Sequence, residues 1–158
     1  MTNFQARRVT HQYTQTNVAP PQTVFPLLCP VREADWVPGW QYRLIYSQSG
    51  FAEAGCIFIT QENGSDTTWV VTEYDPANFR IAFVWITPGT MTARIHISLE
   101  RFESIAKAHI QYTYTALSPH GNEELEPYNA PWFREKMQGW EAAINHYLKT
   151  GKRIDAAD

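Results

Sequence analysis

The chain has 158 residues, of which 44% are hydrophobic and 14% aromatic, with a formal net charge of −3 and a pI near 5.9. This length is typical of one domain, so we expect a single domain over residues 1–158, with its core at about residues 9–151 and a tail at residues 152–158. Lysines and arginines are scattered, and the sequence lacks the basic stripe of a nucleic-acid-binding protein.

The N-terminal part predicts one strand followed by short helices. Residues 8–18 alternate between apolar and polar side chains, as a strand does. Pro20 and Pro21 favour a helix start, because proline is tolerated in the first helical turn. Pro30 is expected to end this helix, and residues 33–36 are expected to form a second short turn.

From Trp40 onward the apolar pattern has a period of two, which predicts strands joined by hairpins. Asn63-Gly64 is the strongest hairpin signal, because both residues accept the positive φ of a type I′ turn. A weaker turn signal lies near Glu103-Ser104. The expected strands are residues 40–47, 56–60, 67–74, 80–87, 91–100 and 110–116.

The C-terminal third predicts helices. Ser118-Pro119 can cap a short helix that runs to Glu126, and Asn129 is the expected N-cap of a long one. Gly151 is the expected stop of the long helix. Its apolar stripe is formed by Phe133, Met137, Trp140, Ile144, Tyr147 and Leu148.

This order of elements predicts an α+β helix-grip fold. A bent antiparallel sheet of about seven strands would wrap around the long C-terminal helix, and the short helical pair after strand one would close one end. A sheet and a helix packed in this way tend to leave a gap, so we expect a ligand cavity between them.

Several segments of the sequence also resemble those of a known superfamily. The chain is similar to START-like helix-grip proteins of the SRPBCC superfamily, which includes lipid-transfer domains, polyketide cyclases and the Hsp90-activator-like group. The resemblance implies a cavity for an apolar or amphipathic small molecule and no shared catalytic set. The resemblance covers about residues 9–151. It is carried by the segments "VFPLLCPVREADWVPGW", "IYSQSGFAEAGCIFIT", "TWVVTEYDP", "YTYTALSPHGN" and "WEAAINHYL". The first two of these segments resemble an uncharacterised bacterial branch of the superfamily.

Glu33 and Glu73 are the candidate catalytic residues. Glu33 lies among tryptophans on the segment expected to rim the cavity, where desolvation would raise its pKa and suit it to acid–base chemistry. Alternatively, Glu33 accepts backbone N–H groups or pairs with Arg32 or another cation. Glu73 shares strand parity with Trp69 and faces inward if Trp69 does; otherwise Tyr74 faces inward instead.

The remaining reactive residue types point to no metal or covalent chemistry. His96 belongs to a polar strand face without a second ligand at metal-binding spacing, so we expect no metal and no cofactor. Cys29 and Cys56 form neither a CxxC motif nor a disulfide framework, which is typical of a reducing compartment. Residues 1–17 lack the apolar region of a signal peptide, and the run at residues 81–86 is too short to span a bilayer, so we expect a cytoplasmic protein.

Aromatic residues are the candidate ligand contacts. A core built from Leu, Ile and Val needs no polar partners, whereas each buried Trp or Tyr carries an N–H or O–H group. A set of such side chains suits a flat or ringed ligand that bears a few oxygen atoms, although any one of them can simply fill the core. The candidates are Trp36, Trp40, Tyr42, Tyr46, Trp69, Phe83, Trp85, Tyr112, Tyr114 and Trp140.

Three functions remain open from the sequence. The first is the binding of an apolar or aromatic small molecule beneath the long helix. The second is a cyclase, dehydratase or hydrolase that uses a pocket carboxylate with a tyrosine hydroxyl. The third is a protein-interaction domain or homodimer, which needs an exposed apolar patch to which Trp132 and Phe133 can contribute.

Overall fold

The computed structural model describes residues 3–62 and 64–154. The elements follow the predicted order, and the fold is the predicted helix grip. The strands are β1 (Arg8–Asn17), β2 (Arg43–Tyr46), β3 (Ile57–Glu62), β4 (Ser65–Asp75), β5 (Arg80–Thr87), β6 (Met91–Phe102) and β7 (Ile105–Ala116). The helices are α1 (Pro21–Val24), the 3₁₀ helix η1 (Phe25–Leu28), α2 (Pro30–Glu33), α3 (Pro119–Leu125) and α4 (Ala130–Thr150).

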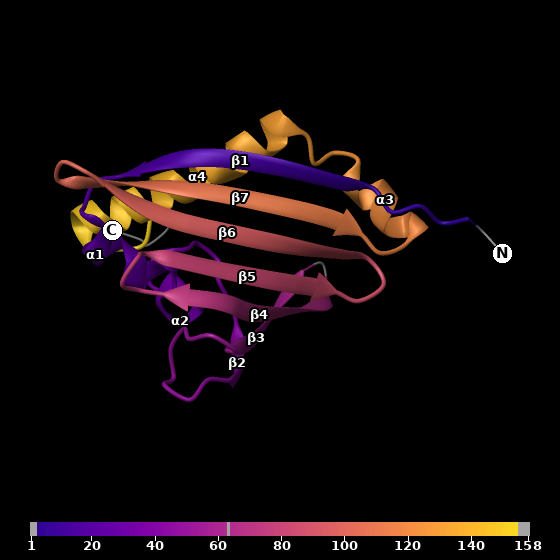
Figure 1. The fold of residues 1–158 in the computed structure, drawn as a ribbon, viewed down its shortest axis with the longest axis horizontal. Helices are drawn as coiled ribbons and strands as arrows, with labels where there is room; N and C mark the ends of the chain where they lie inside the picture. Colours follow the sequence, from indigo (N-terminus) through magenta and orange to yellow (C-terminus); the bar gives the residue numbers. More distant parts are fainter. Residues whose placement is uncertain (1–2, 63, 155–158) are drawn as a thin grey trace.

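All seven strands form one antiparallel sheet in the order β1-β7-β6-β5-β4-β3-β2. α4 runs along one face of this sheet and contacts β1 (Figure 1). α3 lies at one end of the sheet, and α1 and α2 lie toward the other end (Figure 1). The short helices and α3 therefore flank opposite ends of the space between the sheet and α4.

The short helices differ in one respect from the prediction. Pro30 begins α2, whereas we expected Pro30 to end a helix and residues 33–36 to form the next turn. A proline at the first helical position lacks only an N–H group that has no intrahelical partner there. The turn then continues past α2, because the Val37 amide donates to the Glu33 carbonyl at 2.8 Å.

Register shifts change which side chains face inward on β2 and β4. The register of β2 against β3 shifts between Leu44 and Tyr46, and Tyr46 is 59% exposed. The register of β4 against β5 shifts between Val71 and Glu73. After this bulge Tyr74 points to the core, so the strict alternation expected for both strands is wrong.

The hairpin predicted at residues 63–64 joins β3 to β4. Glu62 pairs with Ser65, and Gly64 has φ of +81°, while Asn63 lies outside the described residues. The weak turn signal at Glu103-Ser104 is also confirmed, and Glu103 has φ of +59°. β7 begins at Ile105, five residues earlier than predicted, because Ala106 and Ala108 continue the inward alternation without bulky side chains.

The caps of the C-terminal helices are as predicted. Ser118 accepts a hydrogen bond from the Gly121 amide at the start of α3, at 3.0 Å. Asn129 accepts one from the Trp132 amide at the start of α4, also at 3.0 Å. α4 ends at Gly151, whose φ of +71° favours glycine.

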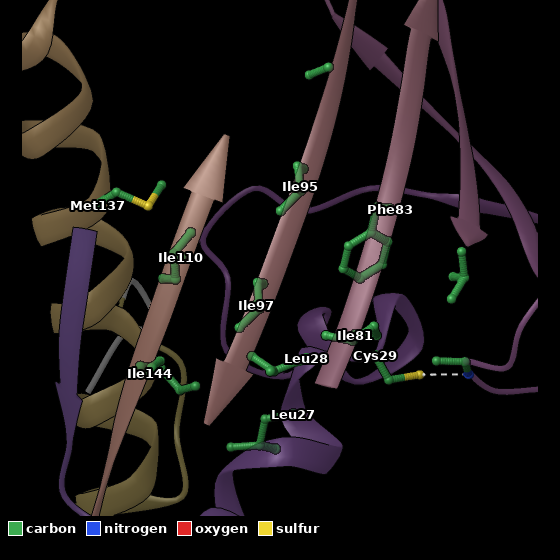
Figure 2. Close-up of a cluster of buried hydrophobic side chains, with 14 of the residues drawn as sticks. Leu27, Leu28, Cys29, Ile81, Phe83, Ile95, Ile97, Ile110, Met137 and Ile144 are labelled. Atoms are coloured by element: carbon green, nitrogen blue, oxygen red, sulfur yellow. Dashed lines mark hydrogen bonds between the residues drawn. The ribbon is translucent and has the colours of Figure 1, made fainter. Parts of the chain in front are cut away.

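The core lies between the sheet and the helices. Leu27 and Leu28 of η1 lie near the isoleucines of β5 and β6, and Met137 and Ile144 of α4 lie near Ile110 of β7 (Figure 2). Leu28 is 1% exposed and Ile144 is fully buried. The end of the gap near α1 and α2 is therefore filled by buried side chains, which include the aliphatic Leu27 and Leu28 and the aromatic Trp36.

Candidate functional site

A cavity of about 330 Å³ lies at the opposite end of the gap, beside α3 and the first turns of α4. This volume falls in the range of about 300–1,000 Å³ that is usual for small-molecule sites. Its lining residues come from β4, β5, β6, β7, both C-terminal helices and their connection. They are Ser65, Thr67, Trp69, Trp85, Thr87, Thr90, Met91, Tyr112, Tyr114, His120, Glu124, Tyr128 and Lys136.

Strand register builds the aromatic wall of this cavity. Trp69 pairs with Trp85 across β4 and β5, and Trp85 pairs with Ala93 of β6. Ala93 in turn pairs with Tyr114 of β7. Side chains of one cross-strand row share a face, so two tryptophans and a tyrosine line up with one small residue between them. The Trp85 and Tyr114 ring centroids are 6.2 Å apart above this alanine.

Two tyrosines of β7 line the cavity, and the hydroxyl of one of them has no hydrogen-bond partner within the described residues. Tyr114 is 1% exposed, and its hydroxyl makes no hydrogen bond within the described residues. Burial, with smaller contributions from Tyr112 and Tyr128, raises the pKa of Tyr114. Burial and the nearby Glu33 charge raise the pKa of Tyr112. Both phenols are therefore neutral hydrogen-bond donors at neutral pH.

Polar side chains surround the rest of the cavity. The hydroxyls of Thr67 and Thr87 are 2.7 Å apart, which makes a hydrogen bond between β4 and β5. His120 and Glu124 of α3 lie 3.0 Å apart. The Lys136 ammonium lies 5.3 Å from the Tyr112 ring centroid, within the distance of a cation–π contact. The cavity thus combines aromatic walls with a polar margin.

Glu33 lies near the cavity but is not part of its lining. The residue as a whole is only half-buried, yet the protein around its carboxyl removes enough water to raise its pKa well above the usual value of 4.5. Within the described residues, no hydrogen bond offsets this desolvation. The alternative of pairing with Arg32 is wrong, because that guanidinium binds Asp35 at 3.0 Å.

Glu73 faces away from the cavity. Its carboxylate lies 4.0 Å from Arg80, and its side chain is 43% exposed. Glu73 and Arg80 line a shallow depression on the outer face of the sheet together with His96. The β4 bulge after Val71 reverses the alternation, so of the two orientations that the sequence leaves open, the one with Tyr74 facing inward and Glu73 outward is found.

The ten aromatic candidates fall into three groups. Four of them line the cavity, namely Trp69, Trp85, Tyr112 and Tyr114. Phe83 and Trp36 belong to the buried core, and the Trp36 ring centroid lies 5.0 Å from that of Trp140. The Trp36 indole donates to the Leu27 carbonyl at 2.8 Å. Trp36 and Trp140 therefore connect the segment of the short helices to α4, whereas the Phe83 ring packs against Trp69.

The remaining three candidates lie at the β2 edge of the sheet. Trp40 and Tyr42 line a separate open groove and stack with their ring centroids 6.4 Å apart. Trp40 also meets Trp69 edge-on at 6.3 Å, so it supports the cavity wall from behind. Tyr46 lies on the surface after the β2 register shift and contributes no wall.

Some lining residues were not predicted from the sequence. Thr67 and Thr87 share strand parity with Trp69 and Trp85, so the same alternation identifies them once the tryptophans are assigned inward. Tyr128 belongs to the connection between α3 and α4, for which no periodic pattern exists. Lys136 lies four residues after Trp132 on α4, and a helical lysine is ordinarily a solvent-facing residue.

The start of α4 does not form the exposed patch that a protein-interaction domain needs. Phe133 is 2% exposed, and Trp132 is half-buried with its ring stacked 4.0 Å from that of Tyr128. The described residues contain no cluster of three side chains placed to bind a metal ion. Across the same part of the chain, none of the helices has the length and apolar character of a membrane span.

Comparisons with known proteins identify the fold. No family model matches the chain, and no curated protein matches it. A crystal structure of Ara h 8.0201 matches with a TM-score of 0.65 at 14% identity, covering 91% of this chain and 99% of that one. Norcoclaurine synthase from Thalictrum flavum matches with a TM-score of 0.68 at 12% identity, covering 92% and 88%.

A third similar structure is DynU16, described as a putative protein in the dynemicin biosynthetic locus. It matches with a TM-score of 0.61 at 16% identity over 90% of this chain and 48% of that chain. Norcoclaurine synthase has also been solved in complex with dopamine and hydroxybenzaldehyde. At these identities the likeness concerns the fold alone. The chain has the helix-grip fold of START-like SRPBCC proteins, as its sequence resemblance predicts.

Proposed function

We propose that this protein binds an aromatic or amphipathic small molecule in the cavity beside α3. The observation that carries the proposal is the cavity of about 330 Å³ whose walls include Trp69, Trp85 and Tyr112. Aromatic walls with a few polar groups at their margin are typical of small-molecule sites.

The fold comparison supports the same class of ligand. Norcoclaurine synthase, which shares the fold, has been solved with dopamine and hydroxybenzaldehyde. Both compounds carry an aromatic ring and oxygen atoms. Trp69 and Trp85 offer such rings flat surfaces of the kind that favour offset or edge-to-face stacking.

Native mass spectrometry of the purified protein, followed by organic extraction, tests this proposal. The expected result is an added mass that disappears on extraction and belongs to a ringed, mainly apolar compound. Tryptophan fluorescence provides a second measurement, because Trp69 and Trp85 line the cavity. An empty protein whose fluorescence is unchanged by a panel of aromatic compounds would falsify the proposal.

A second candidate function is acid–base catalysis on the bound molecule. The observation that favours it is Glu33, whose carboxyl has a raised pKa and acts electrostatically on the cavity residue Tyr112. A carboxyl whose pKa is raised above its usual value is better matched to proton transfer near neutral pH than an ordinary one. Glu73 takes no part, since its side chain lies on the outer face of the sheet.

Turnover of the extracted compound by the wild type and Glu33→Gln separates binding from catalysis. If the protein is an enzyme, the compound is consumed and Glu33→Gln slows this by about 100-fold or more, the usual contribution of general acid–base catalysis. If the protein only binds, the compound is recovered unchanged with both proteins.

A further inference from the structure

We propose that the outer face of the sheet binds an acidic amphipathic helix of another protein, with an apolar strip beneath the helix and an arginine on either side of it. The outer face is the one turned away from α4 and the cavity, so this surface is independent of the proposed ligand site. The apolar strip, called the outer strip below, lies on β3, β4 and β5. Its members are Ile57, Ile59, Thr68, Val70, Val84 and Ile86.

Alternation along the strands assigns the outer strip to the outer face. Phe58 is 1% exposed, and Trp69 and Trp85 line the cavity, so their neighbours in each strand point the opposite way. Ile86 is 43% exposed, and the other members of the strip are half-buried. The outer strip is thus a flat and partly exposed apolar surface.

Strand register makes the outer strip continuous. It consists of two adjacent cross-strand rows, each with one residue from β5, β4 and β3. The rows are Val84–Val70–Ile57 and Ile86–Thr68–Ile59. Neighbouring strands are about 4.8 Å apart, so each row spans about 10 Å. This width matches the diameter of one α-helix, about 10–12 Å with its side chains, so a helix that lies along the strands would cover the strip.

An arginine extends the two rows at opposite ends. Arg94 of β6 pairs with Val84, and Arg43 of β2 pairs with Ile59. Both arginines are exposed, and within the described residues neither guanidinium has an ion-pair partner. A helix on the outer strip would therefore have one guanidinium on each flank, which favours carboxylates on both sides of its apolar stripe.

The charge around the outer strip also favours an acidic partner. Neither row contains an acidic residue, although the chain has a formal net charge of −3. β4 carries a carboxylate beyond each end of the strip, and both have partners within the protein. Asp66 accepts a hydrogen bond from Gln61 at 3.2 Å, and Glu73 lies 4.0 Å from Arg80. The charges left to complement are those of the two arginines.

Three other occupants fit the outer strip less well. A second copy would pair this surface with itself, which brings the same arginines and no carboxylate into the contact. A bilayer favours apolar groups that protrude, whereas the strip is flat and mostly half-buried. Nucleic acid favours a continuous basic surface or stacking aromatic rings, whereas here aliphatic side chains separate two single charges.

A matched set of stapled helical peptides tests the proposal. Each peptide carries the same leucine stripe at i, i+3, i+4 and i+7, flanked on both sides by glutamate, glutamine or lysine. We expect the glutamate peptide to bind about threefold to tenfold more tightly than the glutamine peptide, because exposed ion pairs contribute modestly, and the lysine peptide to bind most weakly. The glutamate preference, measured by fluorescence anisotropy, should disappear at about 1 M salt, where the Debye length is about 3 Å.

Variants locate the bound helix. Arg94→Gln and Arg43→Gln should each weaken binding of the glutamate peptide by about twofold to fivefold and leave the glutamine peptide unaffected. Arg8→Gln is the matched control, because Arg8 is an exposed arginine of β1 in the same cross-strand row as Ile86 but outside the strip. Val70→Thr keeps the shape of the side chain, adds a hydroxyl to the strip and should weaken binding of all three peptides.

Proton–nitrogen correlation spectra should show shifts of the Val70 and Val84 amide signals when the glutamate peptide binds. Equal affinities for the three peptides, shifts confined to other surfaces, or no binding at millimolar peptide would overturn the proposal. Outer-strip signals that change with protein concentration in the absence of peptide would assign this surface to a second copy instead. Binding of phosphatidylserine vesicles in place of the peptides would assign it to a membrane, and either result overturns the proposal.

Discussion

At one end of the space between the sheet and α4, side chains of η1 and α2 fill the gap, whereas at the α3 end a cavity is left open. The filled end includes Leu27, Leu28 and Ile144, which carry no polar side-chain atoms, and the fully buried Trp36, whose indole donates to the Leu27 carbonyl. The open end is built from Trp and Tyr around the small residue Ala93. One sheet and one helix thus support a packed core and a binding site side by side.

The difference shows what each kind of residue contributes. Aliphatic side chains interdigitate at the density of a protein interior and stabilise the fold. Large aromatic rings fixed on paired strands cannot collapse into the space between them, so they keep the cavity open. Their polar atoms need partners: the Trp69 indole donates to the Thr60 hydroxyl at 2.9 Å, whereas the buried Tyr114 hydroxyl has no hydrogen-bond partner within the described residues.

The largest expected effect is at the filled end. Leu28→Ala removes a side chain that is 1% exposed, and it should lower the free energy of unfolding by about 2–5 kcal/mol. Ser65→Ala at the mouth of the cavity should change it by about 0.5 kcal/mol or less. Urea denaturation of both variants measures these free energies of unfolding. Equal losses of stability in Leu28→Ala and Ser65→Ala would contradict the difference between the filled end and the open end.

Gly121→Ala should have the next largest effect, because α3 packs closely against the turn before β6. A Cβ atom at Gly121 would lie 1.9 Å from the Thr90 carbonyl oxygen, so α3 must move. We expect a loss of about 1–3 kcal/mol in the free energy of unfolding, and weaker ligand binding because Thr90 and α3 border the cavity.

Gly139→Ala is the matched control for this substitution. Gly139 lies within α4 and has open space where a Cβ atom would be, so alanine should stabilise the protein by about 0.5–1 kcal/mol. Thermal denaturation with and without a bound probe checks both variants. A neutral Gly121→Ala would show that α3 adjusts freely over the cavity.

The raised pKa of Glu33 predicts that the stability of the protein depends on pH. The pKa of Glu33 is raised in the folded protein by desolvation, so the folded state holds the proton more tightly than the unfolded state does. The free energy of unfolding should therefore fall as pH rises from the unfolded pKa of 4.5 through the folded pKa.

The Glu33→Gln variant isolates this contribution. Glu33→Gln removes the ionisable group, so this variant should exceed the wild type in stability at pH values above the folded pKa of Glu33. The two proteins should converge below the unfolded pKa. Parallel pH profiles in urea denaturation would show that Glu33 is well solvated in the folded protein.

Tyr114→Phe should give a small change in the free energy of unfolding, and one of opposite sign to that of most core substitutions. The Tyr114 hydroxyl is buried without a partner, so its removal should stabilise the empty protein by about 1 kcal/mol. Tyr13→Phe is the control, because the Tyr13 hydroxyl donates to Glu141 at 2.6 Å and its loss should destabilise. Destabilisation by Tyr114→Phe would indicate a partner for this hydroxyl.

Much of the fold could be predicted from the sequence, because its local signals are regular. The alternation in β6 assigns Met91, Ile95 and Leu99 to the core, and all three are buried. Asn129 and Gly151 mark the ends of α4 by their capping chemistry. These signals depend on neighbours in the chain and therefore survive without knowledge of the tertiary structure.

The candidate site could be predicted only in part. A bulge adds one residue and reverses the facing of all that follow, so Glu73 and Tyr46 lie elsewhere than strict alternation predicts. Whether an aromatic ring borders a cavity depends on what lies across the gap: Trp36 meets Trp140, whereas the half-buried Trp85 lines the cavity. Lys136 carries no sequence signal that distinguishes it from other helical lysines.

The most direct test of a binding site at the α3 end is a titration of the protein with the flat aromatic compound fluorenone, followed by proton–nitrogen correlation spectra. If the ligand binds there, we expect shifts on binding in the indole N–H signal of Trp85 and in the amide signals of Thr87, Tyr114 and Lys136. Signals of Leu28 and Ile144 at the filled end should stay in place. Shifts confined to the filled end or to the groove beside Trp40, or no shifts at all, would contradict a binding site at the α3 end.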